Sequence, residues 1–396
     1  MRIASSWMFA LVSLVGCQRV AESEIYQEAA AAAPAPARCR PGTAAEVRGV
    51  AWSDVQDALD QAQPYDVVNI CPGVWQGNFV LPPHAGPLEL RGVTGDPDDV
   101  VLDGGGSGIL LDDALGGTWR LRALTLQNAE TLAELSRSGT VAVEVLDCLF
   151  LGPAYDVGLT VGTTKSVTVK RSAFRGLSVQ ALRAFPLVAG NQILLEDVLF
   201  EDNGPDTVAE IGFSSWATPA VPDLVTLRHV SFRNNVTEGG GSLRMEPSWS
   251  ARVLVEDSEF IGNDNLFVPP VSIDAHLRSH ADAFVMGFDR TIFADNQGGD
   301  GTALWVNSSQ RLGVGPDKVH FGIRDSAFLR NRSNGSESHP DNVAALFHTT
   351  NSVVHLRNVN FGVGADTNEG HDVLGCDLDL GAHVDADLWA NAYGCP

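Results

Sequence analysis

Residues 253–263 read Val-Leu-Val-Glu-Asp-Ser-Glu-Phe-Ile-Gly-Asn, and their spacing recurs along most of the chain. Counting back from Phe260, apolar or small residues stand seven, five and two positions earlier, while Asn263 follows three positions later. Alternating apolar and polar residues indicate a strand, and the slip of one position between the two pairs indicates a corner. The inward positions of the other copies are Trp119, Leu121, Leu124 and Leu126; Val143, Val145, Cys148 and Phe150; Val167, Val169, Ser172 and Phe174; Ile193, Leu195, Val198 and Phe200; Val225, Leu227, Val230 and Phe232; Met286, Phe288, Thr291 and Phe293; Phe321, Ile323, Ser326 and Phe328; and Val354, Leu356, Val359 and Phe361.

Each copy also has a polar residue at its corner, and most have a further short strand after it. The corner residues are Asp147, Arg171, Asp197, His229, Asp257, Arg290, Asp325 and Asn358. The later strand begins with a small residue and then Leu or Ile, at Ala181-Leu182, Ser242-Leu243, Ser272-Ile273, Ala303-Leu304 and Ala345-Leu346. Short strands repeated every 24 to 35 residues cannot bury their apolar faces alone, so each unit has to stack on the next. The repeats therefore predict an all-β fold, a single-stranded right-handed parallel β-helix, which is a solenoid.

Two motifs in these repeats resemble those of a known family. Phe-x-x-Asn occurs at residues 200–203, 232–235, 260–263, 293–296 and 328–331, and glycine-rich stretches at 239–243 and 299–304 end in Ser-Leu and Ala-Leu. These motifs resemble the paired FxxN and GGA(I/L) repeats of polymorphic membrane protein passengers and, more broadly, the pectin-lyase-like β-helix superfamily. The resemblance covers residues 119–361 and implies a fold, but adhesins, lyases, hydrolases and epimerases all use that fold.

The N-terminus has the pattern of an export signal. Arg2 precedes an apolar run that ends in Leu14-Val15-Gly16-Cys17, which resembles the lipobox of bacterial lipoproteins and implies lipidation of Cys17. An ordinary signal peptide with a chance cysteine is the alternative. The apolar run is too short to remain as a membrane span. Gln18 favours anchoring in the outer membrane, and the sequence does not indicate whether the protein faces the periplasm or the exterior. We therefore expect a signal peptide at 1–17 and, because residues 18–38 are rich in Ala and Pro, a tether up to residue 38.

The globular part is expected to begin near residue 39. Residues 53–63 predict a short amphipathic helix with Ser53 as its N-cap, and this helix would cover the open end of the sheet. Residues 67–70, 78–81, 88–90, 100–102 and 109–111 predict the first strands, so residues 39–118 form the N-terminal cap and the first rungs. Residues 119–361 form the regular repeats, and residues 362–396 form a C-terminal cap.

Cysteine positions agree with an exported protein. Cys39 and Cys71 bracket the N-terminal cap, and Cys376 and Cys395 bracket the C-terminal cap, so two disulfides are plausible in an oxidising compartment. Cys148 occupies an inward position of the repeat, which predicts a buried and inert thiol rather than a reactive one.

Charge excludes one class of partner. The formal net charge of -23 argues against nucleic acid or an anionic membrane surface as a partner, because both interactions require a positive surface on the protein. Pairs of residues at successive corners alternate between acidic and basic, and stacking would make opposite charges neighbours, which fixes the register. The Asn of each Phe-x-x-Asn is interpreted as structural, since Asn tolerates a left-handed backbone and its amide can bond to adjacent rungs.

Positions that break the repeat are the candidates for a ligand site. If Leu243, Ile273 and Leu304 point inward, the residues one and three positions later point outward, and long excursions at 213–224, 276–285 and 307–319 would wall this face. Acidic, basic and aromatic side chains on a walled sheet are typical of saccharide sites. A solvated face with scattered aromatics is the alternative. The candidate ligand face consists of Arg183, Phe185, Arg244, Glu246, Asp274, His276, Trp305, Asn307 and Phe347.

Complete catalytic motifs are missing from the sequence. Asp112-Asp113 lacks the companion motifs of polygalacturonase-like hydrolases, and none of the three lysines lies on the candidate face. Glu246, Asp274 and His276 are the candidate catalytic residues if the protein is an enzyme. No metal site and no cofactor are expected, although Ca²⁺ stays open because residues 274–282 contain Asp and His.

These observations favour a non-catalytic lipoprotein of the cell envelope, anchored in the outer membrane. It would bind a glycan, or a protein of the envelope or surface, along its side. A polysaccharide lyase or glycoside hydrolase that uses the same face is the competing hypothesis.

Overall fold

The computed structural model describes most of the chain after residue 38. The described residues are 39–83, 86–113, 116–135, 141–162, 165–185, 191–212, 223–246, 251–265, 270–274, 285–298, 303–307, 319–333, 343–348, 352–369, 371–374, 378–380 and 388–389. They belong to one compact unit, Cys39–Pro396. The signal peptide, the tether, Cys17, His276, Cys376 and Cys395 lie outside the described residues, as do almost all residues of the three excursions.

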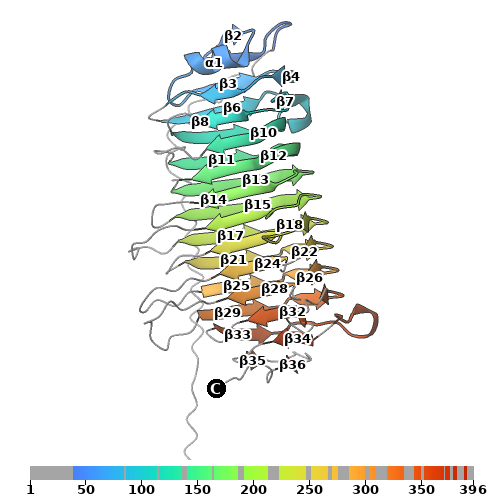
Figure 1. Ribbon diagram of the computed structural model, residues 1–396. Coiled ribbons are helices and arrows are strands. Elements are labelled where there is room, and N and C mark those ends of the chain that lie inside the picture. The colour runs from blue at the N-terminus through green and yellow to red at the C-terminus, as the bar shows by residue number, and fades with distance from the viewer. Residues whose placement is uncertain are drawn as a thin grey trace, which may run out of the picture. The chain divides into compact units, whose positions relative to one another are not determined.

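The described chain is an all-β structure in which parallel strands stack along one direction (Figure 1). Each strand pairs with the equivalent strand of the next repeat, so the strands form three rows. The first row contains β3 (Val67–Ile70), β6 (Pro87–Gly92), β9 (Thr118–Arg122), β11 (Ala142–Leu146), the first parts of β13 (Ser166–Arg175) and β15 (Gln192–Glu201), β17 (Leu224–Arg228), β21 (Arg252–Glu256), β25 (Val285–Asp289), β29 (Val319–Arg324), β33 (Ser352–Arg357) and β35 (Leu378–Leu380).

The second row follows the first corner of each repeat. It contains β4 (Gly73–Gln76), β7 (Val100–Asp103), the first parts of β10 (Thr125–Leu135) and β12 (Leu149–Gly162), the second parts of β13 and β15, β18 (Ser231–Arg233), β22 (Glu259–Ile261), β26 (Ile292–Ala294) and β30 (Ala327–Leu329). A separate small sheet then contains β19 (Val236–Thr237), β23 (Asp264–Asn265), β27 (Gln297–Gly298) and β31 (Arg332–Ser333).

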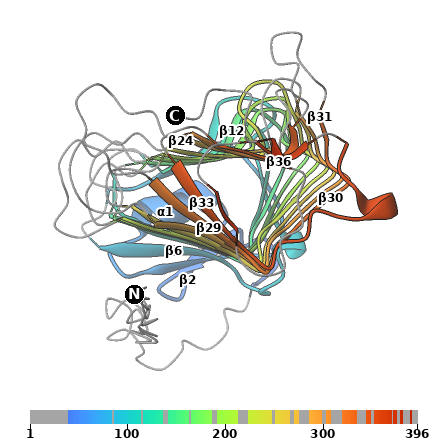
Figure 2. The ribbon, with the colours of Figure 1, turned by 90° about the horizontal axis from the view of Figure 1, so that it is seen from below.

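The third row corresponds to the later strand of the sequence repeat. It contains β5 (Phe79–Leu81), β8 (Ile109–Asp113), the ends of β10 and β12, β14 (Gln180–Phe185), β16 (Ala209–Gly212), β20 (Leu243–Glu246), β24 (Val271–Asp274), β28 (Leu304–Asn307), β32 (Val343–His348), β34 (His371–Leu374) and β36 (Leu388–Trp389). Seen along the stack, the rows face one another across an interior (Figure 2). This long, largely parallel arrangement is compatible with the predicted solenoid.

The inward positions of the repeat form the core. The described residues predicted to point inward are buried, and the Phe of each repeat stacks on the next with ring centroids 4.5 to 5.3 Å apart. This distance matches the spacing of neighbouring strands, because each ring rises with its own strand. The sequence prediction of which side chains point inward is confirmed for these strands.

Both corners use the left-handed backbone conformation. At the first corner the polar residue of every repeat from Asp147 to Asn358 has a positive φ, between 47° and 55°. At the second corner the positive φ belongs to the residue before the ladder Asn, as in Asp202, Asn234 and Gly262. The expectation that the Asn itself takes this conformation is wrong. A positive φ two residues after the Phe aims the following side chain inward, where it is buried.

The Asn residues form a buried hydrogen-bonded ladder instead. Asn263 Nδ2 donates to the backbone oxygen of Phe232 at 3.0 Å and to Asn296 Oδ1 at 2.9 Å. Asn263 Oδ1 in turn accepts from the backbone nitrogen and Nδ2 of Asn235. Each amide therefore satisfies backbone groups that the corner takes out of the strand ladder. The prediction that these amides bond to the rungs above and below is confirmed.

The N-terminal edge of the stack is covered by two elements. β1 (Ala45–Val47) pairs antiparallel with β3 and with β2 (Val50–Trp52), so β3 presents no open edge. The helix α1 (Val55–Gln61) begins after Asp54, whose carboxylate accepts from the backbone nitrogens of Gln56 and Asp57. Ser53 is therefore not the N-cap. The carboxylate of Asp54 reaches the free N–H groups of the first turn, which makes it the cap.

The cysteine predictions can be checked in part. Cys39 and Cys71 form the predicted disulfide. Cys148 is a free cysteine and is buried, as predicted, and burial raises the pKa of its thiol to about 12, which disfavours the reactive thiolate. Two 3-10 turns, η2 (Pro97–Asp99) and η3 (Gly364–Asp366), complete the described elements.

Candidate functional site

The candidate ligand face is the outer face of the third row. Arg183, Glu210 and Arg244 take equivalent register positions on β14, β16 and β20. Ser272, Trp305 and Phe347 take the same position on β24, β28 and β32. We call this line of six positions the face row. Adjacent members belong to neighbouring parallel strands, about 4.8 Å apart. Ser272 is buried, at 4% exposure, so a ligand lying along the stack would contact Arg183, Glu210 and Arg244 on one side of it and Trp305 on the other.

The sequence analysis took Ile273 as the equivalent of Leu304, which aligns Asp274 with Trp305, and this alignment is wrong. Trp305 pairs with Ser272, whereas Asp274 pairs with Asn307, so Trp305 is not one rung from Asp274 in the same line. Val271, which is buried, and Ile273 are both apolar and stand two positions apart in the sequence, so the strand was consistent with two alignments that differ by two residues. Asp274 and Glu246 instead share the line two positions after the face row.

Charged side chains on this face pair with one another. Arg244 donates to Glu246 at 2.5 Å and lies 3.8 Å from Glu210. Glu210 accepts from Gln180 at 3.1 Å and lies 3.9 Å from Arg183. Arginine and glutamate therefore alternate from Arg183 to Arg244, and both Glu210 and Glu246 have an arginine neighbour.

Glu210 is a member of the face that the sequence analysis missed. The repeat at 203–224 lacks the small residue followed by Leu or Ile that marked the other third-row strands. Ala209 takes the inward place of Leu182 and Leu243. An alignment from Ile211, which lies opposite Met245, would have placed Glu210 outward.

Phe185 and Arg183 form a stacked pair. The Arg183 guanidinium carbon lies 5.1 Å from the centroid of the Phe185 ring. The ring also lies over Gly212, where an added Cβ would come within 2.4 Å of the ring edge. Phe185 is therefore a support for Arg183 rather than an open aromatic surface for a sugar.

Trp305 is half-buried at the end of the described face row. Phe347 takes the next register position, and Asn307 and Asp274 lie in strands whose backbone is described. The side chains of these three residues lie outside the described part of the structure. That Asp274 and His276 both point outward from this strand therefore stays a prediction.

The described residues contain no group of three or more His, Cys, Asp or Glu side chains arranged to hold a metal ion. The segment 275–282, which carried the alternative of Ca²⁺, lies outside the described residues. Within the described part of the chain, no helix has the length and apolar character needed to cross a membrane.

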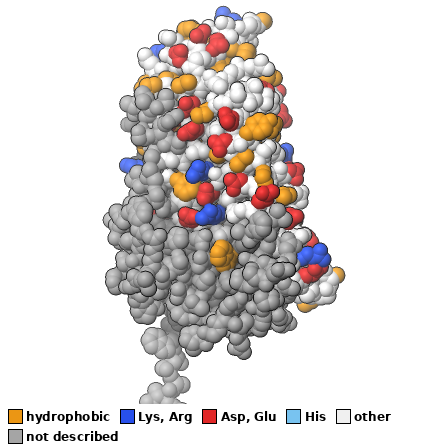
Figure 3. Space-filling view, in the orientation of Figure 1, with side chains coloured by type: hydrophobic (Ala, Val, Ile, Leu, Met, Phe, Trp, Pro, Cys, Tyr) orange, Lys and Arg blue, Asp and Glu red, His pale blue; other side chains and the backbone are white. Residues whose placement is uncertain are grey.

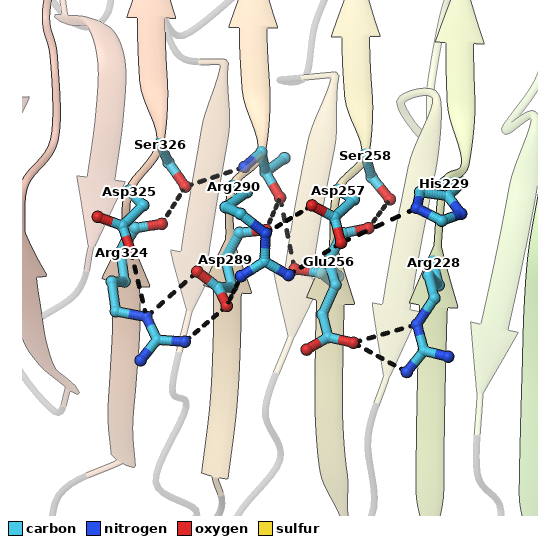
Figure 4. A network of polar contacts seen from close by, with 12 residues as sticks. Arg228, His229, Glu256, Asp257, Ser258, Asp289, Arg290, Arg324, Asp325 and Ser326 are labelled. Carbon is cyan, nitrogen blue, oxygen red and sulfur yellow. Dashed lines mark hydrogen bonds and ion pairs between the residues drawn. The ribbon is translucent and has the colours of Figure 1, made fainter.

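A second charged line follows the first corner and is structural. Arg290 bonds to Asp257 at 2.5 and 2.8 Å, and Arg324 bonds to Asp289 at 2.6 Å (Figure 4). The Arg324 hydrogen bond lowers the pKa of Asp289 below its usual value. The predicted alternation of acidic and basic corner residues is thus confirmed, and its charges bind one another across rungs.

Charged and apolar side chains are also mixed on one further view of the described surface. On the face shown in Figure 3, apolar, acidic and basic side chains of the described residues are interspersed.

Neither protein-family models nor curated protein sequences gave a match to this chain. The site therefore has to be interpreted from its own geometry.

Proposed function

We propose that this protein is a non-catalytic lipoprotein of the cell envelope that binds a glycan or a protein partner along the outer face of its third row. The observation that carries this proposal is the face row itself, where charge-paired Arg183, Glu210 and Arg244 continue into Trp305. Paired charges present fixed donors and acceptors, and an indole offers an apolar surface for a sugar ring. The glycan is the occupant that this combination supports best.

The charge pairing favours binding over catalysis. A general acid or base has to direct a carboxylate oxygen at the reacting bond. Glu246 instead bonds to Arg244, and Glu210 is shared between Gln180 and two arginines. The carboxylate oxygens of this face that do not bond to arginine are therefore suited to accept hydrogen bonds from ligand hydroxyl groups.

The finer architecture belongs to the same proposal. We infer that the three rows wind as one right-handed parallel β-helix, in agreement with the resemblance to pectin-lyase-like proteins and polymorphic membrane protein passengers. Residues 362–396 would cap its C-terminal end, with a second disulfide between Cys376 and Cys395. Intact-mass measurement with and without reduction tests the second disulfide, because reduction of two disulfides adds four hydrogen atoms whereas reduction of the Cys39–Cys71 disulfide alone adds two.

The anchor is proposed from the sequence of the N-terminus. Lipidation of Cys17 would attach the protein to the outer membrane, and residues 18–38 would separate the folded unit from the lipid surface. Mass spectrometry of the N-terminal peptide checks this proposal. An unmodified Cys17, or cleavage at another position, would contradict it.

Binding and turnover can be separated in one set of assays. Purified full-length protein is applied to a glycan array and incubated with a polysaccharide panel, and reducing ends and unsaturated products are measured. We expect binding without turnover. Sustained product formation would establish the competing hypothesis of a lyase or hydrolase, and the absence of binding to any glycan or envelope protein would reject the proposed function.

A variant at Trp305 tests the face directly. Trp305→Ala should weaken glycan binding roughly five- to tenfold, because the ring would lose its stacking surface. Tyr155→Ala is the matched control, since Tyr155 is 58% exposed and belongs to β12 outside the face row. If both variants bind as tightly as the parent protein, Trp305 is not part of the site.

A further inference from the structure

Arg183 differs from the other described arginines of the candidate face. Its side chain is 51% exposed, and its nearest carboxylate, on Glu210, lies at 3.9 Å, beyond hydrogen-bonding distance. Arg244, two strands further along the stack, is bonded to Glu246 at 2.5 Å. Arg183 therefore keeps its donors available for a ligand, whereas Arg244 uses donors within the protein.

Arg183 is nevertheless held in place. Its guanidinium lies over the ring of Phe185, and that ring is supported by Gly212 on the next strand. A cation over an aromatic ring loses little of its hydrogen-bonding capacity, because the ring contacts the flat face and leaves the N–H groups at the edge. The stack thus orders the side chain while its N–H donors stay exposed.

The neighbouring positions carry no second acidic partner. On the preceding strand, Thr160 pairs with Arg183 and Gly162 pairs with Phe185, so neither position opposes an incoming anion. Glu210, on the following strand, is already shared with Gln180 and Arg244. Glu134 takes the position beyond Thr160 in this line, one strand further from Arg183. No carboxylate therefore adjoins Arg183 on the Thr160 side, and one negative group can approach it there.

The net charge of the whole chain limits the number of negative groups that a bound ligand can carry. With a formal net charge of -23, the protein repels a ligand that bears a negative charge on every sugar. A single oxyanion in an otherwise neutral ligand would gain the local contact with little of that repulsion. The two conditions together select a sparsely charged glycan over a polyanion.

Resting on the proposed function, the structure assigns Arg183 as the anchor for a single oxyanion substituent on the bound saccharide, and Gly212 as its positioning residue. Carboxylate, sulfate ester and phosphate ester share the oxygen geometry that a guanidinium recognises. The bound group is therefore an oxyanion, and the ligands compared in the experiment show whether it is a carboxylate, a sulfate ester or a phosphate ester.

The test measures preference between matched ligands. Full-length protein is titrated at low salt with a neutral oligosaccharide that binds in the glycan array and with versions that carry one uronate, one sulfate or one phosphate. We expect at least one charged version to bind about tenfold more tightly than the neutral one, the size of one charge-assisted hydrogen-bonded contact. Arg183→Gln should remove that preference, because it should weaken binding of the charged version about tenfold and binding of the neutral ligand by much less.

Two further variants separate positioning from contact. Gly212→Ala should also lower the preference, because its Cβ would displace the Phe185 ring that supports Arg183. Phe185→Leu removes the ring without adding a clash, and it replaces Gly212→Ala if circular dichroism shows that the latter misfolds. Arg233→Gln should keep the preference, since Arg233 is similarly exposed at 46% but lies on β18 in another row.

The outcomes distinguish the two proposals. A preference that survives Arg183→Gln, or an equal loss for neutral and charged ligands, overturns the assignment of Arg183 as an anion anchor. Equal binding of neutral and charged ligands by the parent protein also overturns it, while the proposed function stands. Loss of binding to every saccharide and every protein partner overturns the proposed function itself.

Discussion

Asp289 is a carboxylate at the first corner with only 8% of its side chain exposed. It accepts hydrogen bonds from Arg324 on the following rung and from its neighbour Arg290. The bond from Arg324 is the largest cause of the lowered pKa of Asp289, and burial opposes it. A buried carboxylate of this kind stabilises the fold only while it is ionised and its arginines remain in place.

Asp289→Asn should destabilise the protein at neutral pH by about 1–2 kcal/mol, because two charge-assisted hydrogen bonds weaken while their arginines stay half-exposed. The folded-state pKa of Asp289 lies below the unfolded value of about 3.9. Its stabilising contribution is therefore complete above that unfolded value and is lost as the pH falls through the folded-state pKa. Urea unfolding at several pH values between neutral and acidic checks both statements.

Asp325 supplies the matched control for this measurement. It is the corner residue that follows Arg324, lies 3.6 Å from Arg324, and has 43% of its side chain exposed. Asp325→Asn should change the unfolding free energy by less than about 1 kcal/mol. Equal losses for the two variants would show that burial of Asp289 adds nothing to the corner.

At the scale of elements, α1 closes a strand edge with one side chain. Gln56 Nε2 donates to the backbone oxygen of Val80 at 3.0 Å, and Gln56 Oε1 accepts from the backbone nitrogen of Val80 at 2.8 Å. The amide thus replaces the strand that would otherwise pair with β5. An edge with unpaired backbone groups is a template for association with other chains, and this side chain occupies it.

Gln56→Glu should loosen this edge. A carboxylate cannot donate to the Val80 oxygen, so one of the two bonds is lost and two oxygens face each other. We expect faster amide exchange at Val80 and a loss of about 1 kcal/mol in the unfolding free energy. Gln61→Glu, an exposed substitution on the same helix, should leave both unchanged, and protection at Val80 equal to that of the parent would contradict the capping role.

The strands also show how much of the structure could be predicted from the sequence. Alternation predicted which side chains point inward, because a strand has only two faces and burial distinguishes them. It did not fix the alignment of β24 and β28. Val271 and Ile273 are both apolar, and a shift of two residues leaves every side chain on the same face of the sheet. The partners of Arg244 and the support of Phe185 by Gly212 depend on side-chain positions across strands, which spacing along one strand does not encode.

At the scale of the whole folded unit, each rung contacts mainly the rungs before and after it. The Phe stack, the Asn ladder and the corner ion pairs all connect adjacent repeats, and the backbone pairings do the same. Stability in such a structure is close to a sum of rung energies and nearest-neighbour interfaces. A perturbation at one end should therefore fade along the stack.

The Cys39–Cys71 disulfide allows a test of that expectation. It joins the start of the folded unit to the end of β3, close to the antiparallel cover that β1 provides. The double substitution of Cys39 and Cys71 by Ser should destabilise this end by roughly 3 kcal/mol, because the released loop gains conformational freedom when unfolded.

Amide exchange shows where that loss is felt. In the double variant, protection of β3 (Val67–Ile70) should fall, while protection of β15 (Gln192–Glu201) stays at the parent level because several interfaces separate it from the edge. Reductant added to the double variant supplies the control, since it should have no further effect on β3. An equal fall in β3 and β15 would mean that the unit unfolds as a whole and that the nearest-neighbour description is wrong.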